Sequence, residues 1–300
     1  MALRSLWMLA ACFFFMLMAL FAKICTGWFS AWEVVLYRSL VGLIFMTAVM
    51  AKKKVDFGTS YPLSHLKRCA AGTLCFALEV SALKLLPLGL AQSISYSSAL
   101  IFILFFIISS RARRRPVEWP LVAVTAAGFG GVLLIARPGS FGFDPAGVAL
   151  GLGAALCGAC VSWSLRELGA QKESRERTVF YFMLAGVVAG LAATAVSPEG
   201  FHAVTLQHLA PLLGVGVSAV IAQIAMTYAW TYGHPILNSI YDFSGILFAT
   251  MAGILFFGES PDLFSVVGMA VIFAAGAAAS VMRLLSEKRA AAVAASRAGE

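Results

Sequence analysis

The chain has 300 residues, of which 61% are hydrophobic and only 12% are charged, about half the charged share of a soluble domain. Together with a mean hydropathy of +0.90, this excludes an ordinary soluble protein and indicates that most of the chain lies in lipid. A net charge of +8 raises the question of nucleic acid, but the basic residues cluster in short segments between apolar runs. That pattern is typical of the loops of a membrane protein, so we expect membrane lipid, and no nucleic acid, among its partners.

Apolar runs recur along the whole chain, each close to the ~20 residues that a helix needs to cross the hydrocarbon of a bilayer. A helix satisfies its own backbone hydrogen bonds, as hydrocarbon demands, so the runs are predicted to be helices. In chain order the ten predicted spans are Ser5–Ala22, Ala31–Met50, Lys67–Leu86, Leu88–Ser109, Glu118–Ala136, Ala146–Leu168, Arg177–Val196, Leu206–Tyr232, Pro235–Phe257 and Leu263–Leu285.

The distribution of Lys and Arg predicts the orientation of these spans. If the N-terminus is in the cytoplasm, 18 of the 22 basic residues lie on the cytoplasmic side of the membrane. Arg38 lies within a span, and Lys23, Lys84 and Arg137 lie on the outer side. Basic loops stay in the cytoplasm. We therefore expect a multi-pass protein of the bacterial inner membrane with both termini cytoplasmic.

The two halves of the chain are weakly similar to each other. A shift of 147 residues brings the segment Ala82–Leu88 onto Ala229–Pro235, and in both places one span ends and the next begins with almost no loop. Each half holds five spans, an odd number, so the halves must insert with opposite orientation. The predicted fold is an all-α membrane protein of ten transmembrane helices in two inverted five-helix repeats, residues 1–140 and 141–286, followed by a disordered cytoplasmic tail over 287–300.

Four segments resemble the drug/metabolite transporter superfamily, in its EamA-type ten-span members. Glu33-Val-Val-Leu-Tyr-Arg38 opens the second span, Ala82 to Ser98 forms a tight turn between the third and fourth, Gly128-Phe-Gly-Gly-Val-Leu-Leu resembles the fifth, and Phe256-Phe-Gly-Glu259-Ser-Pro ends the ninth. The first half has Ser109-Ser-Arg-Ala-Arg-Arg-Arg115 where the family often repeats the Gly-Glu motif. The resemblance implies a transporter with a central substrate cavity.

Three charged residues are clear cases of charges well inside predicted spans, where each costs roughly 2.5–3.5 kcal/mol on insertion scales. Arg38 and Glu79 are both about 10 Å from the outer ends of consecutive spans, so we expect an ion pair between them, either structural or linked to substrate or protons. Asp242 has no cation at its depth and is the candidate for proton coupling. The alternative is a protonated Asp242 hydrogen-bonded to Asn238 or Tyr241.

Polar and aromatic side chains follow single helical faces on several spans, and in lipid such faces point towards protein or a cavity. The predicted cavity is lined by Glu79, Gln92, Tyr96, Trp163, Gln223, Thr227, Trp230, Asn238 and Tyr241. Trp163 has a second interpretation, as an anchor at the membrane interface.

These features favour a monomeric secondary transporter that exports a small polar solute, such as an amino acid or a related compound, by alternating access. The sequence holds no P-loop, HExxH or GxSxG motif, and no cofactor or metal site is expected. Two alternatives stay open: an intramembrane enzyme, and a channel or sensor built on the same bundle. Transport of a solute without covalent change would exclude the intramembrane enzyme.

Overall fold

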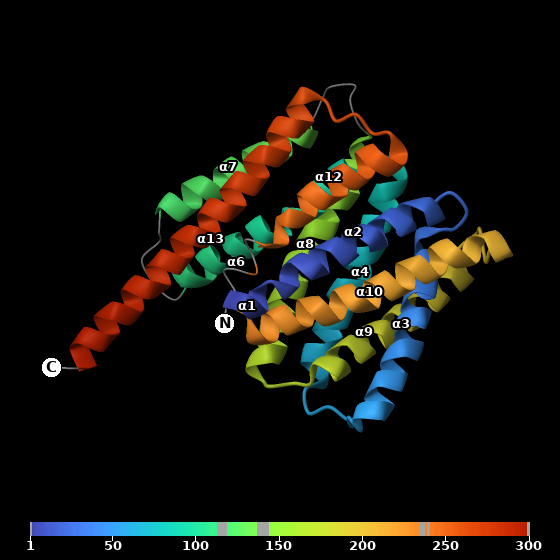
Figure 1. Ribbon diagram of the computed structural model, residues 1–300, viewed down its shortest axis with the longest axis horizontal. Helices are drawn as coiled ribbons and strands as arrows, with labels where there is room; N and C mark the ends of the chain where they lie inside the picture. Colours follow the sequence, from blue (N-terminus) through green and yellow to red (C-terminus); the bar gives the residue numbers. More distant parts are fainter. Residues whose placement is uncertain (1, 113–118, 137–143, 234–237, 239–240, 299–300) are drawn as a thin grey trace.

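A computed structural model describes residues 2–112, 119–136, 144–233, 238 and 241–298 of the chain. Within these ranges every regular element is an α-helix (Figure 1). The helices are α1 Ala2–Ser5, α2 Trp7–Cys25, α3 Ala31–Lys53, α4 Pro62–Leu85, α5 Leu88–Tyr96, α6 Ser98–Ala112, α7 Trp119–Ala136, α8 Pro145–Ala170, α9 Arg175–Val196, α10 Leu206–Tyr232, α12 Ser244–Phe257 and α13 Leu263–Ala298.

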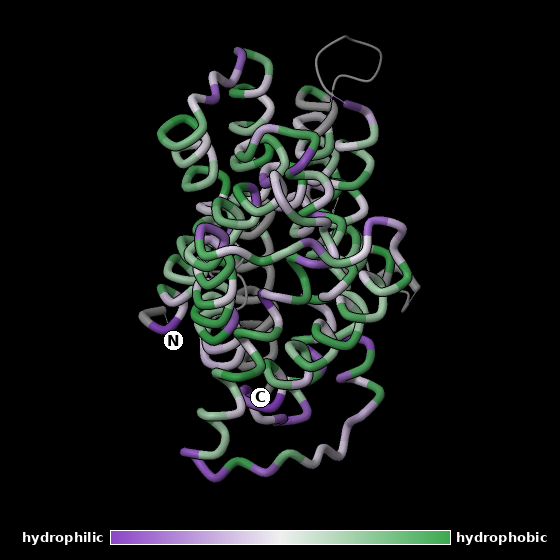
Figure 2. Tube along the Cα trace, turned by 90° about the vertical axis from the view of Figure 1, so that its right-hand side faces the viewer, coloured by the Kyte–Doolittle hydropathy of each residue, from purple (hydrophilic) through white to green (hydrophobic). Residues whose placement is uncertain are grey.

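Five of the described helices, α2, α3, α8, α9 and α10, are long and apolar enough to cross a membrane. Shorter apolar segments lie in α5 and α6, α7, α12 and α13. The third predicted span, α4, is less apolar because it carries Arg68 and Glu79, which face the interior of the bundle. Figure 2 shows the helices coloured largely hydrophobic, with hydrophilic residues mainly in the connections.

The structure differs from the sequence prediction in two places. The fourth predicted span is not one helix: α5 ends at Tyr96, Ser97 forms a turn, and α6 begins at Ser98. The segment predicted to be a disordered tail is helical as far as Ala298, as a continuation of α13. The tight turn between α4 and α5 is present as predicted, whereas its counterpart at His234 and Pro235 lies outside the described residues.

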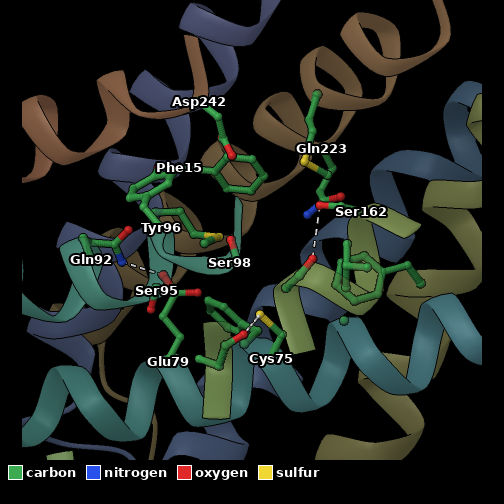
Figure 3. A pocket seen from close by; sticks show the side chains of 18 of the residues that line it. Phe15, Cys75, Glu79, Gln92, Ser95, Tyr96, Ser98, Ser162, Gln223 and Asp242 are labelled. Carbon is green, nitrogen blue, oxygen red and sulfur yellow. Dashed lines mark hydrogen bonds between the residues drawn. The ribbon is translucent and has the colours of Figure 1, made fainter. Parts of the chain in front are cut away.

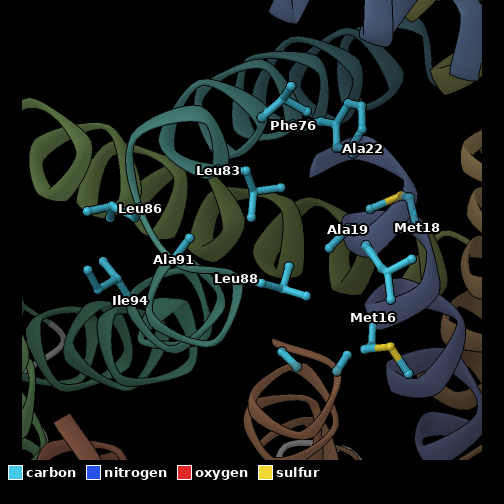
Figure 4. Close-up of a cluster of buried hydrophobic side chains, with 14 of the residues drawn as sticks. Met16, Met18, Ala19, Ala22, Phe76, Leu83, Leu86, Leu88, Ala91 and Ile94 are labelled. Atoms are coloured by element: carbon cyan, nitrogen blue, oxygen red, sulfur yellow. The ribbon is translucent and has the colours of Figure 1, made fainter. Parts of the chain in front are cut away.

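The helices of the first and second halves pack mainly against each other: α2 with α10, α3 with α9, α4 with α8, and α5 with α12. Buried side chains of α2, α4 and α5 meet in the apolar core shown in Figure 4. The helices α7 and α13 lie side by side along one edge of the bundle (Figure 1). A methyl group added to Gly131 on α7 would lie 2.8 Å from the backbone oxygen of Gly268 on α13, so glycine permits this close approach.

The glycine pairs at helix-packing spacing also lie at contacts within the bundle. Gly147 and Gly151 on α8 face side chains of Leu86 and Ile94, and a methyl group at Gly190 on α9 would lie 2.8 Å from the backbone nitrogen of Leu36. Small residues at these points let neighbouring backbones approach closely.

Candidate functional site: a central cavity

A cavity of about 150 Å³ lies between the helices of the two halves (Figure 3). This volume is smaller than that of usual small-molecule sites, about 300–1,000 Å³. Charged and polar side chains point into it from both halves. They are Arg38, Arg68, Cys75, Glu79, Gln92, Ser95, Tyr96, Ser98, Ser162, Gln223 and Asp242, and aromatic rings of Phe15, Phe76 and Phe182 complete the wall.

One face of α4 supplies much of the lining. Arg68, Gly72, Cys75 and Glu79 follow one another at intervals of four, three and four residues, so they form one stripe along the helix. In the charge count Arg68 belongs to the inner side, at the start of the third predicted span, but in the structure its side chain is buried and lines the cavity. The helical spacing of Arg68 to Glu79 was the signal that could have found it.

Two arginines lie beside the same aromatic ring in the cavity wall. The guanidinium carbon of Arg68 is 4.2 Å from the ring centroid of Phe182, and that of Arg38 is 5.0 Å from the same centroid. Arg38 also lies 4.2 Å from the ring centroid of Phe76. Such stacking stabilises a desolvated cation through the negative face of the ring. Arg68 donates one hydrogen bond, of 3.0 Å, to Oε1 of Gln223 on α10.

The direct ion pair predicted between Arg38 and Glu79 is not formed. Glu79 accepts a hydrogen bond of 2.5 Å from the side-chain amide of Gln92, while Arg38 is occupied by its two aromatic neighbours. Both residues still border one cavity. The equal depth inferred from the sequence is consistent with their position at one cavity. Side-chain packing, however, directs Arg38 towards the rings of Phe76 and Phe182.

The break between α5 and α6 borders the cavity. Gln92, Ser95 and Tyr96 line it from the end of α5, and Ser98 from the first residue of α6. A second break occurs before α12: Tyr241 and Asp242 are helical, Phe243 is in a turn, and α12 begins at Ser244. Backbone irregularity at membrane depth is tolerated where it borders a cavity.

Asp242 projects into the cavity near Phe15 (Figure 3). The described contacts of its carboxylate are with the thiol of Cys12 on α2, whose sulfur lies 3.7 Å from Oδ1. Within the described part of the chain no Lys or Arg pairs with it, and neither Asn238 nor Tyr241 donates to its carboxylate. Among the described residues, Asp242 is thus a carboxylate that borders the cavity without a paired cation.

Five residues predicted to line the cavity lie elsewhere. Thr227 and Trp230 are one and two turns beyond Gln223, and they line a smaller space beside Glu173. Trp163 is 38% exposed and lines a groove with Lys67 and Phe105. Asn238 is buried against α10, where it donates to the carbonyl oxygen of Ala229 at 2.7 Å. Tyr241 packs against a cluster formed by α2 and α10.

One end of the bundle, named here the Glu259 end, is held by a carboxylate from after α12. Oε1 of Glu259 lies 2.7 Å from Nζ of Lys23, and it accepts a hydrogen bond of 2.6 Å from the backbone N–H of Leu88. At the same end Glu33 accepts from the backbone N–H of His202 at 2.7 Å. These contacts join segments of the first half to segments of the second.

The opposite end, named here the Glu173 end, is joined by the connection between α8 and α9. Glu173 accepts hydrogen bonds of 2.7 Å from Thr59 Oγ1 and 2.7 Å from Arg177 Nη1. Burial raises the pKa of Glu173, but the hydrogen bonds from Thr59 and Ser174 and the positive charge of Arg177 outweigh it, so the pKa lies below its usual value. Lys53 and Glu176 add an exposed ion pair of 2.8 Å.

The described residues include no group of three or more His, Cys, Asp or Glu placed to hold a metal ion. The cavity presents guanidinium groups, carboxylates, amides and hydroxyls. Groups of this kind can bind and orient a polar solute, and carboxylates can exchange protons.

Comparison with known proteins agrees with this architecture. Residues 145–281 match the EamA-like transporter family. The pseudopaline exporter CntI of Pseudomonas aeruginosa is 28% identical over 267 residues, covering 88% of this chain and 91% of that protein. A riboflavin transporter of Rhizobium johnstonii is 28% identical over 237 residues, covering 78% of this chain and 76% of that protein.

A crystal structure of another protein shares the fold, with a TM-score of 0.68 and 17% sequence identity. The match covers 94% of this chain and 98% of that one. Since the likeness extends over nearly all of both chains, the fold as a whole is shared.

Proposed function

The chain is an EamA-type member of the drug/metabolite transporter superfamily and a multi-pass membrane protein, and we propose that it exports a small polar solute by alternating access through the central cavity. The observation that carries the proposal is the cavity itself: helices of both halves wall it, and Arg38, Arg68, Glu79 and Asp242 border it. Charged groups at membrane depth are costly, so their gathering around one space favours a solute pathway.

The packing of the helices supports two inverted repeats over residues 1–140 and 141–286. If spans one to five correspond to spans six to ten, α2 corresponds to α8 and α4 to α10. A two-fold relation then exchanges the pair α4 and α8 with the pair α10 and α2, and both pairs are in contact. The breaks at Ser97 and at Phe243 fall one residue apart under the 147-residue shift. Transporters with inverted repeats place discontinuous helices at the solute site.

We assign the Glu173 end to the cytoplasm of the bacterial inner membrane. Lys53, Lys67, Arg175 and Arg177 lie at this end, whereas Lys23 and Lys84 lie at the other. Basic residues stay on the cytoplasmic side of a membrane. Export as the direction follows the relative named as a pseudopaline exporter. A single chain encloses the cavity, so we propose that the monomer is the transporting unit.

Solute movement in proteoliposomes tests the proposal. Liposomes loaded with a mixture of amino acids and vitamins are assayed for release by mass spectrometry, which also detects any covalent change. Ser162→Trp places a large ring in the cavity, and Val188→Trp places the same ring on the exposed face of α9 as a control. We expect release of an unchanged solute by the wild type and by Val188→Trp but not by Ser162→Trp. Covalent change without release would instead support the enzyme.

A further inference from the structure

We propose that the cavity recognises its solute by a carboxylate group held between Arg38 and Arg68, so that the solutes are free amino acids or amino-acid conjugates and not neutral or purely cationic compounds. The inference rests on the proposed function, because it names the class of solute for the same cavity. It uses Arg68, which was not among the residues predicted to line the cavity.

Both arginines have hydrogen-bond donors that no described residue uses. Each side chain is only 2% exposed, and each lines the cavity. Arg38 donates no hydrogen bond to any described residue, and Arg68 donates to Gln223 alone. A guanidinium group has five N–H donors, and a buried donor without an acceptor costs about 1–3 kcal/mol. A carboxylate supplies acceptors for two such groups and forms charge-assisted bonds with them.

The two cations lie beside the same aromatic ring. Arg38 and Arg68 come from α3 and α4, yet both guanidinium groups lie within 5.0 Å of the ring centroid of Phe182. The negative charge of Glu79 favours the Arg38 cation, but the two like charges repel each other, and no carboxylate forms an ion pair with either arginine among the described residues. An anionic group of the solute would relieve that repulsion. A stack that served only to pack helices would not need two unpaired cations.

The cavity also presents acidic groups to the rest of the solute. Glu79 and Asp242 border other parts of the same cavity, and Glu79 is held in place by Gln92. A carboxylate near the arginines and an amino group near these acids would together match both signs of charge. This arrangement favours a zwitterion over a simple anion, since a simple anion leaves Glu79 and Asp242 without a cation.

The test measures binding by the purified full-length chain, followed by tryptophan fluorescence during heating. The probes are three matched series: proteinogenic amino acids, their carboxamides, and the amines that remain after decarboxylation. The variants are Arg68→Gln and Arg68→Lys. Lys67→Gln is the control, because Lys67 is adjacent in sequence, exposed, and paired with Glu167 at 3.6 Å.

In the wild type and in Lys67→Gln, we expect at least one free acid to raise the melting temperature and its carboxamide to bind about tenfold more weakly or worse, as loss of a charge-assisted contact predicts. In Arg68→Gln, acid and carboxamide should bind equally. A purely structural arginine would lower the melting temperature without changing this ratio. Arg68→Lys keeps the charge and retains part of the preference, which covers the case that Arg68→Gln does not fold.

Three results would overturn the inference: an acid preference that survives in Arg68→Gln, carboxamides or amines that bind as well as acids in the wild type, or no stabilisation by any probe. The outcome is separable from that of the transport assay. An acid that binds but is not released from liposomes contradicts the proposed function and leaves the carboxylate site standing. Release of carboxamides as fast as acids contradicts the carboxylate site and leaves the transporter standing.

Discussion

Glu259 and Lys23 form an ion pair of 2.7 Å that connects the end of α12 to the end of α2. Gly258 makes this possible, because its φ of +62° turns the chain sharply after the helix. Glu259 then also accepts from the backbone N–H groups of Leu88 and Gly89, which are free donors at the start of α5. The Gly-Glu motif thus has a physical role in closing one end of the bundle.

We predict that Glu259→Gln lowers the free energy of unfolding by about 2 kcal/mol or more, because Lys23 and the first N–H groups of α5 lose a charged acceptor. The comparison is Lys53→Gln, which breaks the exposed pair with Glu176 and should cost less than about 1 kcal/mol. Melting temperatures in one detergent measure both. Equal shifts in the two variants would show that Glu259 does not have this role.

Adjacent glycines on α7 offer a test of helix packing. A methyl group at Gly131 would meet the backbone oxygen of Gly268, whereas one at Gly130 would have nothing within 4 Å. Gly131→Ala should therefore destabilise the chain by about 1–3 kcal/mol, and Gly130→Ala should leave it unchanged or slightly more stable. Chemical or thermal unfolding distinguishes the pair. A Gly130→Ala variant that is as unstable as Gly131→Ala would contradict the close contact of α7 with α13.

Glu173 predicts a pH dependence of stability. Its pKa is lowered in the folded protein, so its contribution is fully present above the unfolded value of about 4.3 and is lost as the pH falls through the lower folded value. Glu173→Gln should therefore melt below the wild type at about pH 7, and the difference should shrink below about pH 4.

The control for this prediction is Thr178→Val, which removes a hydrogen bond of 2.9 Å to the backbone oxygen of Ser174 without removing an ionisable group. Its effect on the melting temperature should not change with pH. If the lowering of the melting temperature by Glu173→Gln is also independent of pH, the ionised form of Glu173 does not stabilise the Glu173 end.

Asp242 is the candidate for coupling solute movement to protons. It borders the cavity, and its described contacts are with Cys12, so a proton can bind to and leave its carboxylate as the cavity changes its access. We predict that Asp242→Asn folds but loses the pH dependence of transport between about pH 6 and about pH 8. Measurement of solute flux in proteoliposomes across this pH range, for the wild type and the variant, tests the prediction. An unchanged pH profile and rate would assign Asp242 a structural role and make Glu79 the next candidate.

Hydropathy and helical periodicity predicted much of the fold. Helix α10 has the predicted bounds, and α3, α7 and α9 begin or end at predicted residues. The break at Ser97 was not predicted, because Ser95-Tyr96-Ser97-Ser98 is a short polar segment without Gly or Pro inside an otherwise apolar run. Beside the break, Tyr96 packs against Gly245 of α12.

The candidate site was predicted less completely than the fold. Glu79, Gln92, Tyr96 and Gln223 border the cavity as expected, because residues on one helical face share a direction. Helical spacing does not show where along the helix axis a cavity ends. Thr227 and Trp230 were therefore predicted to line the cavity, although Met226 is the last residue of α10 that does. The count of charges by side grouped Arg68 with the basic residues of the inner side, since such a count has no information on burial.

Alternating access is the central claim, and chemical labelling of the cavity from each side of the membrane tests it most directly. A variant in which the native cysteines are replaced and Ser162→Cys is introduced into the cavity can be labelled by an impermeant maleimide in right-side-out and in inverted vesicles. Alternating access predicts labelling from both sides, with a transported solute slowing both reactions. Labelling from one side only, whatever solute is added, would contradict it.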